Sequence, residues 1–186
     1  ASFMREVFYY HNIRKHAPSA QANFVRLYIN DQDWGIYQNV QQLNKDFLEE
    51  WWFSNDGSNF RADSPTSTFG GGGPGGGGGA QWGDGTAAMN YLGEDTTLYQ
   101  KYYTLKSTDS AYAWDELIEA CMALNQTPIT DLHNVLSSYF DLDRTLWHLA
   151  SEVLFADDDS YIYKGKMDYY LYRDADQYHR ILDAWP

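Results

Sequence analysis

The sequence predicts an α+β fold with two unequal lobes, because its strands and helices are segregated along the chain instead of alternating. Three observations support this. Two β-type segments near the N-terminus flank a short polar turn, three helical patterns occupy residues 113–154, and a strand with period-two alternation follows them. We therefore expect an N-terminal hairpin and helix unit and a helical C-terminal part within a single domain, residues 1–186.

The N-terminal elements are predicted to be a helix, a hairpin and a second helix. Ser2 is a helix-capping residue before an apolar pattern, and Pro18 ends that unit. Residues 24–30 and 34–40 are rich in β-branched and aromatic side chains, which predicts two strands joined by a turn at residues 31–33. Asn44 predicts the N-cap of the second helix.

Residues 54–85 have a different composition and are predicted to be a Gly-rich loop insertion. Nine glycines flank Pro74, and glycine at this density loses too much entropy to form a regular element. A lid over a ligand and a disordered surface loop are the two alternatives. A phosphate-binding P-loop is excluded, because no Lys-Ser/Thr pair follows the glycines and no predicted strand precedes them.

The C-terminal half is predicted to begin with a tyrosine-rich strand at residues 98–106 and to continue with three helices. The first covers residues 113–124, the second opens at Pro128, and the third has Asp141 as its N-cap. The third carries an apolar stripe that should face the core: Leu142, Leu146, Trp147, Leu149, Ala150, Val153 and Leu154. A strand at residues 167–172 and a short one at residues 179–182 complete the order.

The charge balance excludes several classes of partner. The chain has 26 acidic and 13 basic residues and a net charge of -13, which argues against nucleic-acid binding and against anionic membrane surfaces. No apolar run reaches the ~18 residues of a membrane span. Cys121 is the single cysteine, so no internal disulfide forms, and we expect a buried, inert thiol. The chain starts at Ala1, which suggests a trimmed piece of a longer protein.

The most informative motif is the run Asp157, Asp158 and Asp159 between the third helix and a strand. Adjacent carboxylates repel one another, so such a cluster implies a cation or a chemical task, with a solvated helix end as the alternative. Calcium remains an alternative ligand, although no EF-hand pattern is present. Magnesium fits better, because one or two carboxylates plus substrate phosphates suffice to hold it. That combination predicts phosphoryl transfer.

Several ordered segments together resemble the CotH family, named for a spore coat protein and regarded as atypical, kinase-like phosphotransferases. The matching segments are Ser2-Phe3-Met4-Arg5-Glu6, Leu27-Tyr28-Ile29-Asn30, Trp34-Gly35-Ile36-Tyr37, Asn39 to Leu48, Asp159-Ser160-Tyr161 and Asp168-Tyr169-Tyr170-Leu171-Tyr172. The resemblance covers nearly the whole chain. It implies a two-lobed, protein-kinase-like fold, ATP with Mg²⁺ or Mn²⁺, and transfer of the γ-phosphate to protein hydroxyls.

The resemblance also assigns roles to individual residues. Asp159 takes the place of the catalytic aspartate. Asp168 replaces the family's common Asn and is a candidate metal ligand together with Asp157 and Asp158. Arg61 stands where the family's phosphate-holding Lys is expected. Lys164 and Lys166 are further candidates for phosphate contact, with a basic turn that balances the aspartates as the alternative reading of these two lysines.

The chain departs from the family pattern at three places. Arg61 replaces Lys and keeps the charge but not the shape of the contact, Gln41 replaces a Glu, and the Trp-Asp-x-Asp segment that supplies a metal ligand would begin about where the chain stops. Asp183 is the candidate stand-in. The alternative to a working kinase is therefore a catalytically silent surface or structural protein that binds metal and partner proteins. In both cases we expect an extracytoplasmic location, a protein substrate or assembly partner, and self-association.

Overall fold

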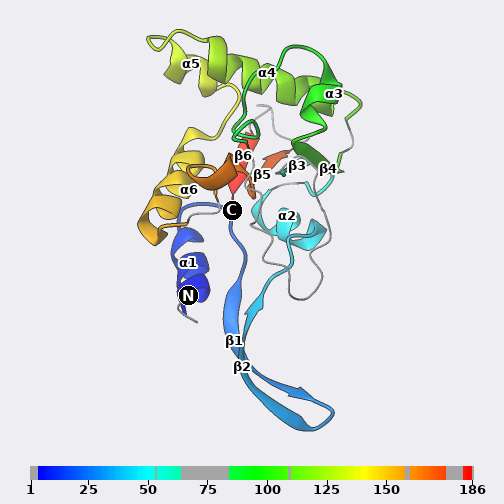
Figure 1. Cartoon of the computed structure of the whole chain (residues 1–186), viewed down its shortest axis with the longest axis vertical. Helices are drawn as coiled ribbons and strands as arrows, with labels where there is room; N and C mark the ends of the chain where they lie inside the picture. Colours follow the sequence, from blue (N-terminus) through cyan, green and yellow to red (C-terminus); the bar gives the residue numbers. More distant parts are fainter. Residues whose placement is uncertain are drawn as a thin grey trace.

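The computed structural model describes residues 4–52, 54–63, 84–108, 110–157, 160–174 and 182–185, and it confirms a mixed α+β architecture (Figure 1). The elements in chain order are α1 (Arg5–Ile13), β1 (Ala22–Ile29), β2 (Gln32–Val40), α2 (Lys45–Trp51), β3 (Ser58–Ala62), α3 (Thr96–Tyr99), β4 (Tyr103–Ser107), α4 (Ala113–Gln126), α5 (Leu132–Leu136), α6 (Leu142–Phe155), a short 3₁₀ helix (Lys164–Lys166), β5 (Tyr170–Arg173) and β6 (Leu182–Trp185).

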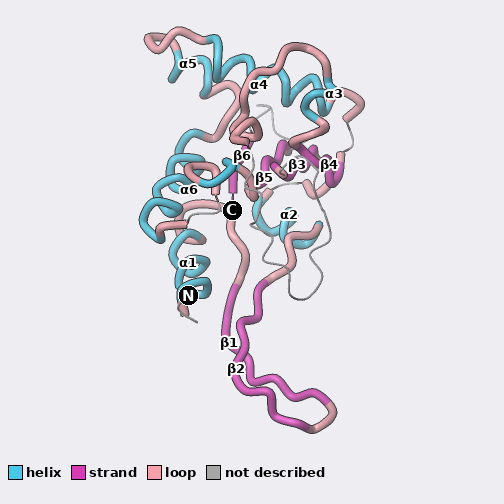
Figure 2. The backbone as a smooth tube through the Cα atoms, viewed as in Figure 1, coloured by secondary structure: helices cyan, strands magenta, loops and turns pink. Residues whose placement is uncertain are grey.

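The predicted N-terminal hairpin is confirmed. Strands β1 and β2 pair antiparallel and form a sheet of their own, which projects away from the rest of the chain (Figure 2). Asn30 and Asp31 have positive φ angles of 51° and 61°, the conformation of a two-residue hairpin turn, so the turn lies slightly earlier than predicted. We call this hairpin the arm. Its large apolar side chains are exposed: Phe24, Tyr28, Ile29, Trp34, Ile36 and Tyr37.

The second sheet has the strand order β4-β3-β5-β6, and its described pairs are antiparallel. Strand β3 lies inside the segment that the sequence predicted to be a loop insertion. Four of its five residues are buried, so both faces of the strand are covered and the sequence lacks the alternation that marks a half-exposed strand. The glycine-rich part of that segment, residues 64–83, lies outside the described residues.

The two faces of this sheet pack against different helices. Phe60 pairs with Leu171 across β3 and β5, and both belong to the main core with Leu117 and Cys121 of α4. The neighbouring register positions, Arg61 opposite Tyr170 and Asn59 opposite Tyr172, point to the other face. There Tyr172 packs with a smaller cluster from α2 and its C-terminal end: Phe47, Leu48 and Trp52.

Helix α2 begins where the sequence predicts, because the Asn44 side chain accepts hydrogen bonds from the backbone N–H groups of Asp46 and Phe47. Its Glu50 joins three earlier segments by accepting from Arg14, from Gln21 at 3.0 Å and from Gln41 at 3.0 Å. Burial tends to raise the pKa of the Glu50 carboxyl, but these hydrogen bonds outweigh burial and hold its pKa below its ordinary value.

The predicted strand at residues 98–106 is correct only in its second half. Asp95 caps a short helix by accepting from the backbone N–H of Thr97, so Leu98 and Tyr99 are helical and β4 starts at Tyr103. The Tyr99 ring is still fully buried, and its hydroxyl accepts a hydrogen bond from the backbone N–H of Leu92 and donates to the carbonyl of Gly93. Burial of tyrosine therefore does not identify the element that carries it.

Helix α6 begins at its predicted cap, where Asp141 accepts from the backbone N–H of Arg144. The predicted buried stripe is wrong: Leu146, Val153 and Leu154 are exposed, and the buried residues are His148 and Glu152. The rotation of α6 is fixed by its neighbours in the N-terminal segment. The ring of Trp147 stacks on His16, and Phe155 meets Tyr9 edge to face, with ring centroids 3.7 Å and 5.2 Å apart.

Within the described residues, no helix combines the length and apolar composition that a membrane span requires.

Candidate functional site

The structure brings together two residues that the sequence singled out, Arg61 and Asp168. A guanidinium nitrogen of Arg61 donates to Oδ1 of Asp168 at 2.9 Å, across 107 residues of chain. The backbone positions them, since Asp168 N–H donates to the Ala62 carbonyl and Ala62 N–H donates to the Tyr169 carbonyl, each at 2.9 Å. Asp168 has a φ of +60°, an uncommon conformation for a residue other than glycine.

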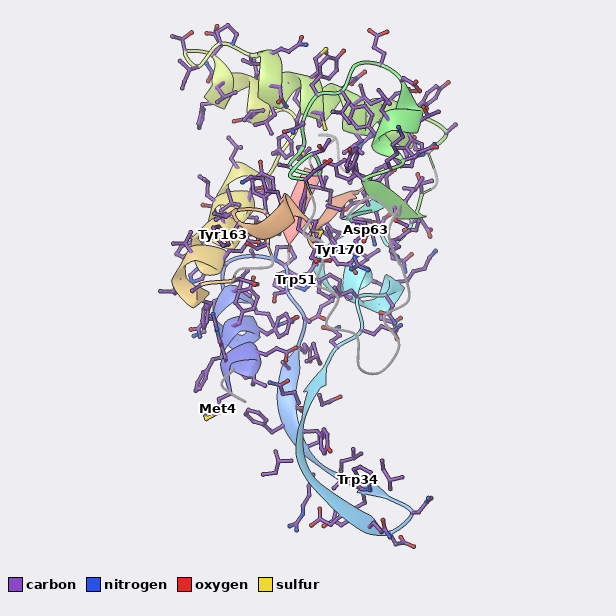
Figure 3. All side chains as sticks on the ribbon, in the orientation of Figure 1. Met4, Trp34, Trp51, Asp63, Tyr163 and Tyr170 are labelled. Atoms are coloured by element: carbon purple, nitrogen blue, oxygen red, sulfur yellow. The ribbon has the colours of Figure 1, made fainter. Side chains whose placement is uncertain are left out.

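A third member of this group, Asp63, was missed by the sequence analysis. Its Oδ1 lies 3.1 Å from Nε of Arg61, and its Oδ2 accepts from the Thr104 hydroxyl at 2.6 Å. The sequence signal that could have identified Asp63 was its spacing from Arg61, because residues two apart along an extended segment point to the same face. Asp63 and Tyr170 lie close to the sheet and α2 in Figure 3.

The Arg61 guanidinium is a cation held by two carboxylates. Burial tends to lower the pKa of Arg61, but the hydrogen bond to Asp168 and the charge of Asp63 outweigh burial, so its pKa is above its ordinary value. All three side chains remain partly open to solvent. A partly open guanidinium flanked by carboxylates can exchange one of them for a phosphate, because both anions match its two-pronged geometry.

Gly57 fixes the start of β3 next to the end of β5. A Cβ atom at this position would lie 2.0 Å from the Arg173 carbonyl oxygen, so glycine is required by close approach of two backbones. The Gly57 N–H donates to the Tyr172 hydroxyl at 3.1 Å, and that hydroxyl donates to the Ser54 carbonyl at 2.6 Å. These contacts set the strand register that aligns Arg61 with Tyr170.

The acidic run is described only at Asp157. Helix α6 ends at Ala156, which is in the left-handed conformation, and Asp157 N–H donates to the Glu152 carbonyl at 2.9 Å. Burial first, and then the charges of Glu6, Asp157 and Tyr170, raise the pKa of the Tyr10 phenol. Asp157 is thus electrostatically coupled to the Tyr10 phenol, which also interacts with Tyr170 of β5.

Asp158 and Asp159 lie outside the described residues, so their roles stay predictions. The two lysines that follow flank Gly165, which has a φ of +72°. Lys166 donates to the Ile162 carbonyl at 3.0 Å, a contact within its own turn that fits the basic-turn alternative. The backbone of Lys164 belongs to the same turn, but its side chain is not among those described.

The opposite face of β5 carries a further ion pair that the sequence analysis did not identify, between Arg173 and Glu116 of α4. Both side chains are largely buried. Because these charges lie on the α4 side of the sheet, this pair is separate from the group around Arg61.

Comparison with known proteins agrees with the order of motifs along the chain. A family model described as "CotH kinase protein" matches residues 1–185. The chain belongs to the CotH family. It is also 27% identical over 167 residues to Invasin CotH3 from Rhizopus delemar, a match that covers 86% of this chain and 25% of that protein. The chain therefore spans about a quarter of the length of this relative.

The departures from the CotH pattern have structural counterparts. Gln41, which stands where the family often has Glu, donates to Glu50 and accepts from the backbone N–H of Gln21. The contacts that the structure shows for Arg61 are with Asp63 and Asp168 instead of Gln41. Asp183 belongs to β6, and its side chain is not described.

Proposed function

We propose that this chain is the part of a CotH-type protein kinase that holds ATP and transfers its γ-phosphate to protein hydroxyls. The carrying observation is the contact between Arg61 and Asp168, which unites on one sheet face a candidate phosphate ligand and a candidate metal ligand. Family membership supports the proposal. The two-lobed, kinase-like arrangement that the sequence predicts is part of the same proposal.

The donor groups around Arg61 fit a magnesium nucleotide. Among the described residues, no three His, Cys, Asp or Glu side chains gather into a metal cage. Magnesium does not need one, because one or two carboxylates suffice when substrate phosphates complete its shell. Asp63 and Asp168 supply two carboxylates on either side of a guanidinium. Manganese accepts the same ligands, and calcium is the third cation to test.

In this proposal each residue has a defined task. Arg61 would orient the nucleotide phosphates, and Asp159 would accept the proton of the acceptor hydroxyl. Asp168 and Asp63, with Asp157 and Asp158, would hold the divalent cation, and Lys164 and Lys166 would contact the phosphates. When bound, the cation would neutralise charge that develops on the transferred phosphoryl group. The protein's contribution would be positioning and electrostatics, the terms that dominate this chemistry.

The proposal is tested by nucleotide binding and phosphate transfer. We expect ATP with Mg²⁺ to raise the melting temperature of the chain beyond the effect of Mg²⁺ alone. Arg61→Gln should remove that increment. Arg26→Gln should keep it, because Arg26 also pairs with an aspartate, Asp33, but does so on the arm. Label from γ-labelled ATP should appear on protein and be lost in Asp159→Asn. Transfer that persists in this variant would contradict the assigned base.

The second candidate is a catalytically silent surface or secreted protein that binds metal and partner proteins and self-associates. Two observations favour it. The relative is named an invasin, and the arm exposes large apolar side chains, with Trp34 near its tip (Figure 3). This function predicts a stabilising effect of Mg²⁺ or Ca²⁺ that ATP does not increase. The thermal-shift experiment therefore discriminates the two candidates.

A further inference from the structure

A cavity lies on the α4 side of the sheet, away from Arg61. It has a volume of about 410 Å³ and is bounded by α5, α6, the end of α4 and strand β5. Tyr169 and Leu171 form its buried floor. At its rim Ile129 is 87% exposed and Leu146 is 64% exposed, so the cavity opens to solvent there. Its size falls within the range of about 300–1,000 Å³ typical of small-molecule sites.

The cavity wall is apolar except at a few positions. Two phenols on the wall already have partners, since Tyr169 donates to the Ala87 carbonyl and Tyr161 to the Ala88 carbonyl. Among the residues that the structure describes, no lysine, arginine, aspartate or glutamate lines it, and its basic side chains are the imidazoles of His133 and His148. Apart from these two imidazoles, an ionised ligand would lose its hydration in this cavity without gaining an opposite charge.

Two hydrogen-bonding atoms on the wall have no partner among the described residues. They are Oγ1 of Thr145 and Nδ1 of His148, both buried. His148 is only 1% exposed, and its other ring nitrogen lies 3.1 Å from Glu152 Oε1, at ion-pair distance but without the alignment of a hydrogen bond. Thr145 and His148 are three residues apart on α6, so they share one face of the helix. Buried polar atoms without partners are rare and destabilising.

We propose that this cavity binds a small, uncharged, mainly apolar molecule that carries a hydroxyl group. The apolar wall would bury the body of the ligand. The hydroxyl would fill the two vacant positions, accepting from the Thr145 hydroxyl and donating to His148 Nδ1 when that nitrogen is unprotonated. The α6 wall of the site thus combines the apolar side chains of Leu142 and Leu149 with the polar atoms of Thr145 and His148. It lies on the face of β5 opposite Arg61, so it goes beyond the proposed kinase site.

Three probes that share a naphthalene ring test the chemistry of the site. We expect 2-naphthol to bind saturably in equilibrium dialysis, and naphthalene, which lacks the hydroxyl, to bind about fivefold more weakly. 2-Naphthoate, which is an anion, should bind more weakly still. Absence of saturable 2-naphthol binding, or equal affinity for 2-naphthol and naphthalene, would overturn the proposal.

Matched variants test the location of the site. Leu149→Trp fills the cavity and should weaken 2-naphthol at least about tenfold, whereas Leu154→Trp on the exposed side of α6 should leave affinity unchanged. Thr145→Val keeps the side-chain shape and removes one of the two proposed hydrogen bonds, so it should lower the affinity for 2-naphthol part of the way towards that for naphthalene without affecting naphthalene itself. Circular dichroism of each variant confirms folding. Binding that survives in Leu149→Trp would place the ligand elsewhere and refute the site. None of these measurements uses ATP, so their outcome is independent of the proposed kinase function.

Discussion

Helices α4 and α6 are each 14 residues long and both have amphipathic sequences, yet they bury different kinds of side chain. Helix α4 places Leu117, Ala120 and Cys121 in the main core. Helix α6 buries His148 and Glu152 and leaves Leu154 77% exposed. One helix follows its hydrophobic pattern and the other does not.

The difference shows what an amphipathic pattern can and cannot specify. Helix α4 lies on an apolar sheet face, so the stripe and the surface that it must cover agree. Helix α6 is oriented by its contacts with the N-terminal segment, where the side chain of Arg5 donates to the carbonyl of Ala156 at 2.9 Å. A cation at the C-terminal end of a helix also interacts favourably with the helix dipole. Contacts along α6 and at its C-terminal end thus fix a rotation that leaves much of its apolar stripe exposed.

The test with the largest expected effect truncates one leucine on each helix and so compares the two helices directly. Leu117→Ala should lower the free energy of unfolding by about 3 kcal/mol, because it leaves a cavity in the core. Leu154→Ala should change it by less than about 0.5 kcal/mol, because this side chain already contacts water. Urea unfolding followed by tryptophan fluorescence measures both values. Equal losses would mean that α6 buries its leucines in solution.

The second test concerns the polar pair inside α6. His148→Leu or Glu152→Met alone should each cost about 2 kcal/mol, because each leaves the other polar group buried without its neighbour. The double variant should be no less stable than either single variant, because two apolar residues then replace a buried polar pair. A double-mutant cycle of unfolding free energies reports the coupling. Strictly additive losses would show that the two side chains do not interact.

The smallest expected effect concerns Cys121 of α4 and appears only at alkaline pH. Burial raises the pKa of this thiol from 9.0 to about 12, so above pH 9 the unfolded chain releases this proton and the folded chain retains it. The folded state then binds more protons than the unfolded state, so the free energy of unfolding falls as the pH rises from 9 towards 12. At pH 10 the loss due to this thiol is about 1.4 kcal/mol.

Cys121→Ala provides the control for this titration. The variant lacks the thiol, so its stability relative to the parent protein should improve by about 1.4 kcal/mol between pH 8 and pH 10. Burial first, and also the charge of Cys121, raise the pKa values of Tyr103 and Tyr169. With or without the thiol, both phenols stay protonated in the folded state up to pH 10, so their contributions cancel in this range. A pH-independent difference would mean that the thiol is accessible to solvent.

Local signals account for the parts of the fold that the sequence predicts correctly. Asn44 and Asp141 cap helices through local hydrogen bonds, and the alternation over residues 167–172 predicted a strand that the structure places at Tyr170–Arg173, three residues later at its start. Strand β3 escaped prediction because it is covered on both faces and carries no alternation. The buried face of α6 escaped prediction because residues near the N-terminus set it.

The candidate site also combines residues that could be predicted from the sequence with one that could not. Motifs that resemble those of the CotH family identified Arg61 and Asp168, and the fold places them in contact. Asp63 belongs to no such motif, and it becomes visible only when β3 is recognised as a strand whose end carries it beside Arg61. The loop insertion was predicted from composition at residues 54–85, a range that includes both β3 and Asp63, so neither was recognised.

The position of β3 at the centre of its sheet has a consequence for synthesis on the ribosome. Its partner on one side, β4, is made early, but its partner on the other side, β5, follows about a hundred residues later, as the 107-residue separation of Arg61 and Asp168 shows. At roughly 5–20 residues per second, that gap lasts on the order of 5–20 s. During this interval one edge of β3 has no strand to pair with. Nascent chains should therefore depend on chaperones until β5 emerges from the exit tunnel.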